Sequence, residues 1–561
     1  MPYDGNPYDD VSINEALDQI SDRCTDRTIR QAAYAIATRN GSYDESALKH
    51  GNPYVNIPVD EALSQLYDRC TDRTIRQAAF AIAANSGGDT YKIKDFSYFF
   101  ANNCRFDEAD NIDTSDGTTF AYTFQYCNMN LVPNINTING VTFYGMFSSC
   151  FGNTPPNIQT SNCTNFTYMF QGCRNLNNMP NFDTHKGIYF SSMFNGCTSL
   201  ATIPNFDTRN GVYFSGMFYG CNNLVSVPNF YTANATHMSQ MFRSCYNITT
   251  VPNFSTHNVT TMQSMFWACR NITNVPNFDT SNTKDMYGMF GMCTNLVNIP
   301  QFVTSNVTNM AQMFNNCTNL TTVPQFDTSN VTNMSDMFNS CTNLTTVPHF
   351  NTSNVTNMAY MFNNCTNLTT VSHFDTANVD NMTYMFYGCT NLVNIPQFVT
   401  SNVINMSNMF ASCCNITNIN ILNTNNCNNF SHTFNNCVNV QSINAINLHS
   451  AKNVIQMFTN CKALTTLVLY DINYSLQIGA GSTWGHLLTV DSLVHTINEL
   501  MPHSGTKTLT MGSVNLEKIA GLYCKVVDST NPKLPMELCE STDEGAMTLS
   551  QYAALKNWQF K

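Results

Sequence analysis

A pattern of apolar and polar positions returns every 24 residues over most of the chain. Residues 306–328 show one unit, NVTNMAQMFNNCTNLTTVPQFDT, in which Asn, Thr and Ser fill most of the places between the apolar residues. The apolar positions of this unit are Val307, Met310, Met313, Phe314, Cys317, Leu320 and Val323. One unit buries too little surface to fold alone, whereas stacked units turn each apolar position into a continuous buried column. The pattern therefore predicts a repeat solenoid, with Asn at tight corners.

A cysteine marks the same place in each unit and sets the expected number of rungs. Upstream of Cys173 the spacing is 23 residues, through Cys150 and Cys127 to Cys104, and downstream it is 24, which predicts about 16 rungs. The members from this point onward are Cys173, Cys197, Cys221, Cys245, Cys269, Cys293, Cys317, Cys341, Cys365, Cys389, Cys413, Cys437 and Cys461.

We interpret the cysteines of this column as small, buried, apolar side chains of the core. Cys163 and Cys427 stand where other units have valine, a substitution that suits a packed interior better than a bonded position. A ladder of disulfides and a metal site are the alternative interpretations. The metal site is disfavoured because a spacing of 24 residues is far from the Cys-x-x-Cys pattern of zinc sites.

The repeated frame NVTNMxxMFxxCTNLTTVPxFDTSNVTNM resembles the BspA-like leucine-rich repeat in its Asn-Val-Thr-Asn-Met variant. The resemblance covers residues 91–470 and implies an α/β repeat solenoid. Each rung would have a short parallel strand at Leu-Thr-Thr-Val, then a second extended segment and a tight turn into the Met-Phe-x-x-Cys corner. Proteins with such repeats act as adhesins or bind host partners, and similar arrays occur in bacteriophage structural proteins.

The N-terminal segment 1–90 is a different duplication, with copies at 5–43 and 51–88. Each copy reads as two short helices with one apolar face, and each is marginal for folding alone. Four arginines recur in the copies, namely Arg27, Arg30, Arg73 and Arg76. These cations are interpreted either as solvated helix faces or as part of a docking module that attaches the solenoid to a larger assembly.

The C-terminal segment 471–561 is predicted to be an α+β cap. It resembles the ending of related surface and phage proteins, with a short helix, a strand reading Thr-Leu-Thr-Met-Gly and a final helix before Lys-Asn-Trp. An insertion at about 523–548 separates these pieces. A cap is expected because the end of a solenoid exposes an open strand edge.

Charge and hydropathy narrow the classes of function. Only 11% of the residues are charged and the net charge is −12, which argues against a nucleic-acid-binding protein. No stretch of about 18 apolar residues is present, so no membrane insertion is predicted. The acidic start MPYDGNPYDD has no signal-peptide pattern, so export by the general route is not expected.

No catalytic motif is found, and no enzyme activity, cofactor or metal site is predicted. The 11 histidines are scattered over variable positions. A recurrent aspartate follows the second Phe of the repeat and raises the alternative of calcium binding. A turn role is favoured, because Val303 and Val399 replace it without disturbing the repeat. The aspartates concerned are Asp183, Asp207, Asp279, Asp327 and Asp375.

Binding would depend on the exposed positions. Residues 286–450 contain no Lys or Arg, and a neutral surface of amides and hydroxyls suits either polyhydroxylated ligands or simple solubility. Tyr219, Arg243 and Trp267 occupy the place after Met-Phe in three successive repeats, and Tyr387 occupies it further on. We expect an aromatic and cationic ligand-binding patch there; isolated surface aromatics are the alternative.

The leading functional prediction is a non-enzymatic phage virion protein, such as a tail fibre or a head or tail appendage. Its N-terminal module would dock on other virion proteins, and its solenoid would bind a host surface protein or glycan. A bacterial cell-surface adhesin is the alternative, and an intracellular scaffold is a third class. No nucleic-acid partner is predicted, and the sequence is compatible with a homo-oligomer.

Overall fold

The computed structural model describes residues 94–102, 114–472, 474–478, 488–502, 504, 506–511, 513–527, 529–531 and 533–560. The predicted docking arginines, Arg27, Arg30, Arg73 and Arg76, lie outside the described residues, as does Cys104. The chain forms two compact units, Met1–Asn258 and Val259–Lys561, which are considered separately below. The boundary between the two units falls inside the segment 91–470, which sequence analysis treats as one solenoid. The predicted domain limits and the count of 16 rungs therefore stay predictions.

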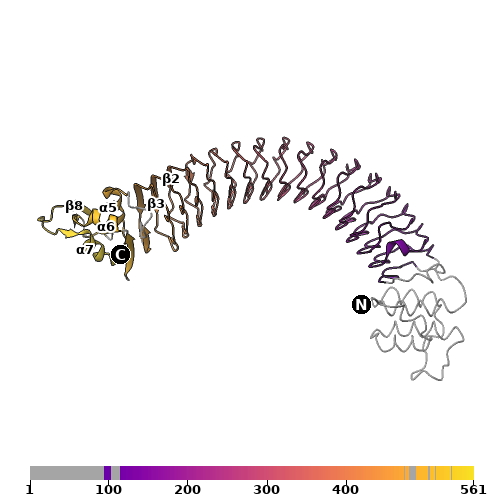
Figure 1. The fold of residues 1–561 in the computed structure, drawn as a ribbon, viewed down its shortest axis with the longest axis horizontal. Helices are drawn as coiled ribbons and strands as arrows, with labels where there is room; N and C mark the ends of the chain where they lie inside the picture. The colour runs from indigo at the N-terminus through magenta and orange to yellow at the C-terminus, as the bar shows by residue number, and fades with distance from the viewer. Residues whose placement is uncertain are drawn as a thin grey trace, which may run out of the picture. The chain divides into compact units, whose positions relative to one another are not determined.

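In each unit the backbone winds into rungs that stack in chain order (Figure 1). A row of parallel bridges joins equivalent residues of neighbouring rungs, such as Asn165, Tyr189 and Tyr213 in the first unit. Asn309 and Asn333 are bridged in the same way in the second unit. This row is called the bridge row below. Most of the backbone hydrogen bonds in the rungs therefore connect one rung to the next.

Two consecutive tight turns form one side of each rung. In the unit around Met310, the N–H of Met313 donates to the Met310 carbonyl at 3.2 Å, and Cys317 closes the second turn on Phe314 at 3.1 Å. The third residue of each turn, Gln312 and then Asn316, has a positive φ, as in a type II turn. Sequence analysis predicts one tight turn at this corner, whereas the structure has two.

Regular strands occur, in the described part of the solenoid, only in the last rungs. They are β1 (Phe398–Val399), β2 (Asn418–Leu422), β3 (Ser442–Asn447) and β4 (Thr466–Tyr470), which pair in parallel in that order. The prediction of a strand in every rung is therefore wrong for the earlier rungs, which form isolated bridges instead. Pro324 and its counterparts contribute to this in most of the earlier rungs, since proline cannot donate to the ladder. Asn420, Asn444 and Val468 take its place in β2, β3 and β4.

The core consists of files of identical residues within each unit. Met310, Met313 and Phe314 have no exposed surface, and the rings of Phe314 and Phe338 stack with centroids 5.7 Å apart. The cysteines are equally buried. Cys293 and its counterparts through Cys461 are free thiols, so the disulfide alternative is excluded for this stretch.

The thiols are more than apolar filler, because each donates to a buried carbonyl of the preceding rung. The Cys317 thiol lies 3.1 Å from the Phe290 carbonyl oxygen, and the Cys341 thiol lies 3.0 Å from that of Phe314. In the first unit, Cys221 is bonded in the same way to Phe194 at 3.1 Å. The column therefore satisfies backbone acceptors as well as filling space.

The C-terminal segment covers the edge of β4. Thr489 donates from its N–H to the Thr465 carbonyl at 2.9 Å, and the N–H of Leu467 donates to the Ser492 hydroxyl at 3.1 Å. The helices are α5 (Val490–Asn498), α6 (Ser513–Ile519) and α7 (Leu549–Leu555), and the short 3-10 helix η3 (Met129–Leu131) belongs to the first unit. Strands β5 (Leu476–Ile478), β6 (Lys507–Met511) and β10 (Trp558–Phe560) form one parallel sheet. The segment predicted as an insertion forms an antiparallel sheet of β7 (Tyr523–Val526), β8 (Met536–Cys539) and β9 (Met547–Thr548).

Candidate binding surface

Three successive rungs of the first unit have charged or aromatic side chains on their outer surface where most rungs have small polar ones. Their Asn-Phe-Asp-Thr segments and the turns that follow, residues 181–186, 205–210 and 229–234, are called the ledge. A ladder of buried threonines holds it: the Thr184 hydroxyl donates to the Asp207 carbonyl at 2.9 Å, and that of Thr208 to the Tyr231 carbonyl at 2.8 Å. The backbone beneath the exposed side chains is thus fixed from rung to rung.

The aspartates of the ledge stabilise their own turns. In each case the carboxylate accepts the backbone N–H two residues further on, from His185 to Asp183 and from Arg209 to Asp207, both at 3.2 Å. This is the geometry of an Asx turn. The turn role predicted for the recurrent aspartates agrees with these contacts.

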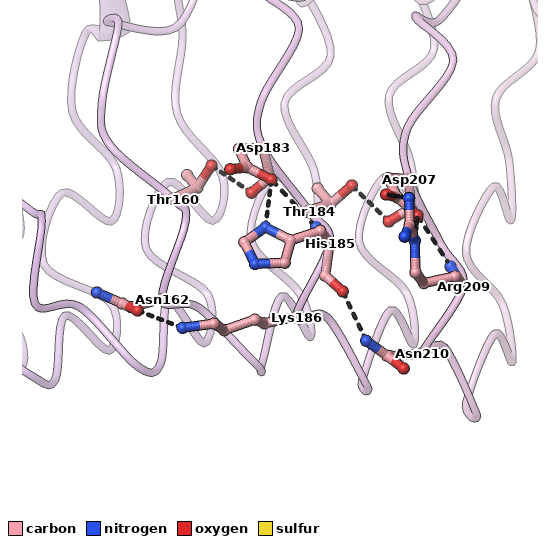
Figure 2. A network of polar contacts seen from close by, with 9 residues as sticks. All are labelled: Thr160, Asn162, Asp183, Thr184, His185, Lys186, Asp207, Arg209 and Asn210. Atoms are coloured by element: carbon pink, nitrogen blue, oxygen red, sulfur yellow. Dashed lines mark hydrogen bonds and ion pairs between the residues drawn. The ribbon is translucent and has the colours of Figure 1, made fainter.

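The same aspartates bond to the side chains of His185 and Arg209 on the ledge (Figure 2). Arg209 binds Asp207 through two nitrogens, with Nη2 at 2.6 Å and Nε at 3.0 Å, and His185 Nδ1 lies 2.7 Å from Asp183. These hydrogen bonds hold the pKa values of both carboxyls below their usual range. Lys186 donates to the amide oxygen of Asn162 at 2.6 Å. The Arg209 charge is therefore matched by a carboxylate, whereas Lys186 is bonded to a neutral amide.

A cavity of about 670 Å³ opens on the ledge between two rungs. Tyr231 occupies the position of the recurrent aspartate, and 58% of its surface is exposed. Phe206 lies buried beneath. The lining residues are Asn205, Phe206, Asp207, Thr208, Arg209, Asn210, Asn229, Tyr231 and Asn234. The cavity offers amides, a phenol and the guanidinium of Arg209 for directed hydrogen bonds. Because Asp207 pairs with Arg209, the lining has no net charge.

The bridge row of the same three rungs is aromatic. Tyr189 and Tyr213 stack with centroids 5.0 Å apart, and the His237 ring follows at 5.1 Å. In the second unit this row begins with Thr261 and Asp285 and continues with asparagines such as Asn309, whose amide oxygen accepts the Ala311 N–H at 3.1 Å. A tyrosine cannot make that bond through its side chain, so these rungs have an exposed aromatic group in place of a local turn cap.

Of the four residues of the predicted aromatic and cationic patch, only Tyr219 and Arg243 belong to the first unit. Arg243 lies over the Tyr219 ring, with its guanidinium carbon 5.8 Å from the centroid. Trp267 belongs to the second unit, where its indole packs on Gly291; a Cβ there would lie 2.3 Å from the ring. Tyr387 lies elsewhere in that unit, with its ring centroid 5.3 Å from that of Tyr384. The structure thus brings Tyr219 and Arg243 together and leaves Tyr387 apart from Trp267.

Sequence analysis did not single out the ledge. The signal was the replacement of the recurrent aspartate by Tyr231, together with Arg209 at a place where most other repeats have Ser, Ala or His. In the parts of the chain that the structure describes, no group of three or more His, Cys, Asp or Glu side chains could hold a metal ion. None of the described helices is long and apolar enough to cross a membrane.

Overlapping segments that together span residues 141–470 match the family described as "Mycoplasma protein of unknown function, DUF285". The chain belongs to this family. The resemblance to BspA-like leucine-rich repeats is confirmed at this level, and the repeat region is a leucine-rich-repeat solenoid. A comparison with curated proteins found no match.

Several solved structures are similar in their repeats. A leucine-rich repeat protein from Eubacterium ventriosum is 16% identical, with 54% of this chain and 82% of that chain covered and a TM-score of 0.29. An internalin from Listeria monocytogenes is 11% identical, with 55% and 82% covered and a TM-score of 0.20. A Leptospira interrogans leucine-rich-repeat protein is 8% identical, with 63% and 95% covered and a TM-score of 0.20.

Proposed function

We propose that this protein is a non-enzymatic binding scaffold whose solenoid presents a recognition surface to another molecule. The observation that supports this most directly is the contrast between its core and the ledge. The core positions repeat almost unchanged, whereas the ledge of three adjacent rungs combines a cavity, the exposed Tyr231 and the bidentate Arg209–Asp207 pair. Ligand recognition commonly uses such variable positions on a rigid framework.

The rungs of the second unit provide the comparison. There the ledge positions hold Gln301 and Gln325, whose amides donate to the backbone of the next rung and so stabilise the stack. Asn205 and Asn229 take the equivalent places in the first unit and line the cavity. The equivalent positions of the second unit line a smaller cavity, of about 390 Å³, in which the glutamine amides are engaged in stacking.

The binding role is tested with the full chain, labelled and incubated with a panel of intact bacterial cells. Saturable binding that unlabelled protein displaces is the expected result. The matched variants are Arg209→Ala/Tyr231→Ala on the ledge and Val303→Ala/Ser305→Ala at the equivalent positions of the second unit. The proposal fails if the chain binds no cell and captures no envelope component.

Where the scaffold is displayed is a separate proposal. The likeness of the repeats to phage structural arrays and the duplicated N-terminal segment support a virion appendage that docks through residues 1–90. Membership of a family described from Mycoplasma proteins supports the alternative, a bacterial surface adhesin. Mass spectrometry distinguishes the two: the chain would be present in purified virions in the first case and in cell-envelope fractions in the second.

A further inference from the structure

We propose that the cavity on the ledge is a binding site for a neutral saccharide. This inference rests on the proposed binding function and assigns a ligand class to one site on the surface. The cavity, of about 670 Å³, lies within the range of small-molecule sites. It is bounded by two adjacent rungs, so a ligand there contacts residues of both.

The first argument is the balance of charge in the cavity. Arg209 is the cation of its lining, and both oxygens of Asp207 are bound to it, at 2.6 and 3.0 Å. The bidentate pair fixes the guanidinium plane and cancels its charge. A phosphate or sulfate ligand would be repelled by the adjacent Asp207 carboxylate, whereas the hydroxyl groups of a neutral sugar can bond to the outer atoms of both residues.

The second argument is the supply of amides. Asn205 and Asn229 are exposed and occupy equivalent positions on neighbouring rungs, so their amides recur at the spacing of the rungs, about 5 Å. Each amide both donates and accepts, which matches the paired donor and acceptor character of vicinal hydroxyls. Asn210 and Asn234 are oriented by bonds from their nitrogens to the carbonyls of His185 and Arg209, both at 2.8 Å.

The third argument is Tyr231, an aromatic residue where most rungs have a residue that caps the turn. Its backbone is held by Thr208, whose hydroxyl donates to its carbonyl at 2.8 Å, while the phenol remains exposed. An aromatic face with a polar tip suits a sugar ring, which has an apolar face of C–H groups and a polar edge. The apolar Phe206 lies beneath the backbone and is buried, so an apolar ligand would find little surface.

The test is the binding of the full chain to immobilised neutral hexose and N-acetylhexosamine oligosaccharides, with sulfated and phosphorylated oligosaccharides as separate probes. Tyr231→Ala and Asn229→Ala should each weaken binding to a neutral probe by 10-fold or more, as estimated for the loss of about 1.4 kcal/mol of contact. The control Val303→Ala/Ser305→Ala should bind as the native chain does. Circular dichroism of each variant establishes that the solenoid is folded.

The outcomes separate this inference from the proposed function. Neutral-saccharide binding that Tyr231→Ala weakens supports the inference. Binding that none of the ledge variants alters, binding restricted to anionic probes, or cell binding that protease abolishes with no saccharide bound would each overturn it and leave the scaffold function standing. Absence of binding to all cells and all probes would overturn both.

Discussion

Phe214 fills the space that a side chain at Gly211 would need: a Cβ built on Gly211 would lie 2.4 Å from Cζ of Phe214. Both residues belong to the same rung of the first unit. In the second unit the same two positions are Val307 and Met310, and both are fully buried. The core thus keeps a similar volume in both units. Phe214 pairs with Gly211 in one, and the thinner side chain of Met310 pairs with Val307 in the other, as close packing requires.

This pairing predicts a compensating double substitution. Gly211→Val should lower the free energy of unfolding by about 2 kcal/mol, because the added methyl groups overlap the Phe214 ring. Gly211→Val/Phe214→Met should recover most of that loss by recreating the arrangement of Val307 and Met310. Urea unfolding followed by circular dichroism measures the difference. If Phe214→Met brings no recovery, the two positions are not coupled through volume.

The thiol column predicts unfolding at alkaline pH. Burial raises the pKa of the Cys341 and Cys461 thiols to about 12, whereas an unfolded thiol ionises near its ordinary value of 9. Below pH 9 the protonated thiols contribute their full stability, and this contribution is lost as the pH rises from 9 toward 12. Each buried thiol loses about 1.4 kcal/mol per pH unit in that window. Because many thiols act together, a steep loss of structure is expected soon above pH 9.

The alkaline transition is measured by circular dichroism together with the ultraviolet absorbance of thiolate. The two signals should change together, since the buried thiols ionise only when the rungs open. Thiolate beyond that of the half-exposed Cys414 and Cys539 that accumulates gradually near pH 9 while the circular dichroism stays native would contradict the buried column. Returning the sample to pH 7 under reducing conditions distinguishes unfolding from chemical damage.

Cys413 and Cys414 provide a control within a single dipeptide. Cys413 is fully buried and its thiol lies 3.0 Å from the Phe386 carbonyl oxygen, whereas Cys414 is half-exposed. Iodoacetamide at neutral pH should therefore modify Cys414 and leave Cys413 unmodified, as read by mass spectrometry of the peptide that contains both. In urea both should react. Equal labelling of the two in the native protein would contradict the burial of Cys413 and the partial exposure of Cys414.

The spacing of the cysteines was sufficient to predict that they share one core position of the repeat. Each rung must bury a side chain at that position, so the same residue type returns at the length of one rung. The first of the two turns was not predicted, because its left-handed position holds residues as different as Gln312, Asp336 and Tyr360. Their backbone is held by bonds to the next rung, for example from Gln312 to Ser335 at 2.9 Å, so the side chain gives no signal. The sequence alone therefore could not reveal this geometry.

The candidate site was harder to predict than the core for the same reason. The repeat defines which positions face outward, but a cavity depends on how side chains of two rungs meet. The predicted contact of Arg243 with Tyr219 could be inferred from equal positions in adjacent repeats, and the structure places them at 5.8 Å. The ledge depended on Tyr231, a single departure from the aspartate consensus, whose importance became visible only beside Arg209 and Asn205.

The cap contains a buried lysine whose protonation affects its stability. Lys556 has no exposed surface; its ammonium group donates to the Asn498 carbonyl at 2.7 Å and lies 4.6 Å from the centre of the Tyr552 ring. Burial lowers its pKa to about 8, from an ordinary value of 10.5. The cost of the buried charge is fully present below pH 8 and is relieved as the pH rises toward 10.5. Stability from this group therefore increases with pH, opposite to the effect of the thiols.

The two effects are separable because they begin at different pH values. Between pH 7 and 8.8 the folded chain already releases the Lys556 proton. The onset of thiol ionisation in the unfolded state is the same in the native chain and in Lys556→Met, so it cancels in the comparison of the two. The free energy of unfolding of the cap should rise by about 1 kcal/mol over this interval relative to that of Lys556→Met, which has no titrating group. Hydrogen exchange of the α5 amides, which reports the opening of the cap, measures it. A native chain and a variant that respond identically to pH would show that Lys556 is not buried as a cation, whereas a rising difference locates the proton release at the contact between α7 and the end of α5.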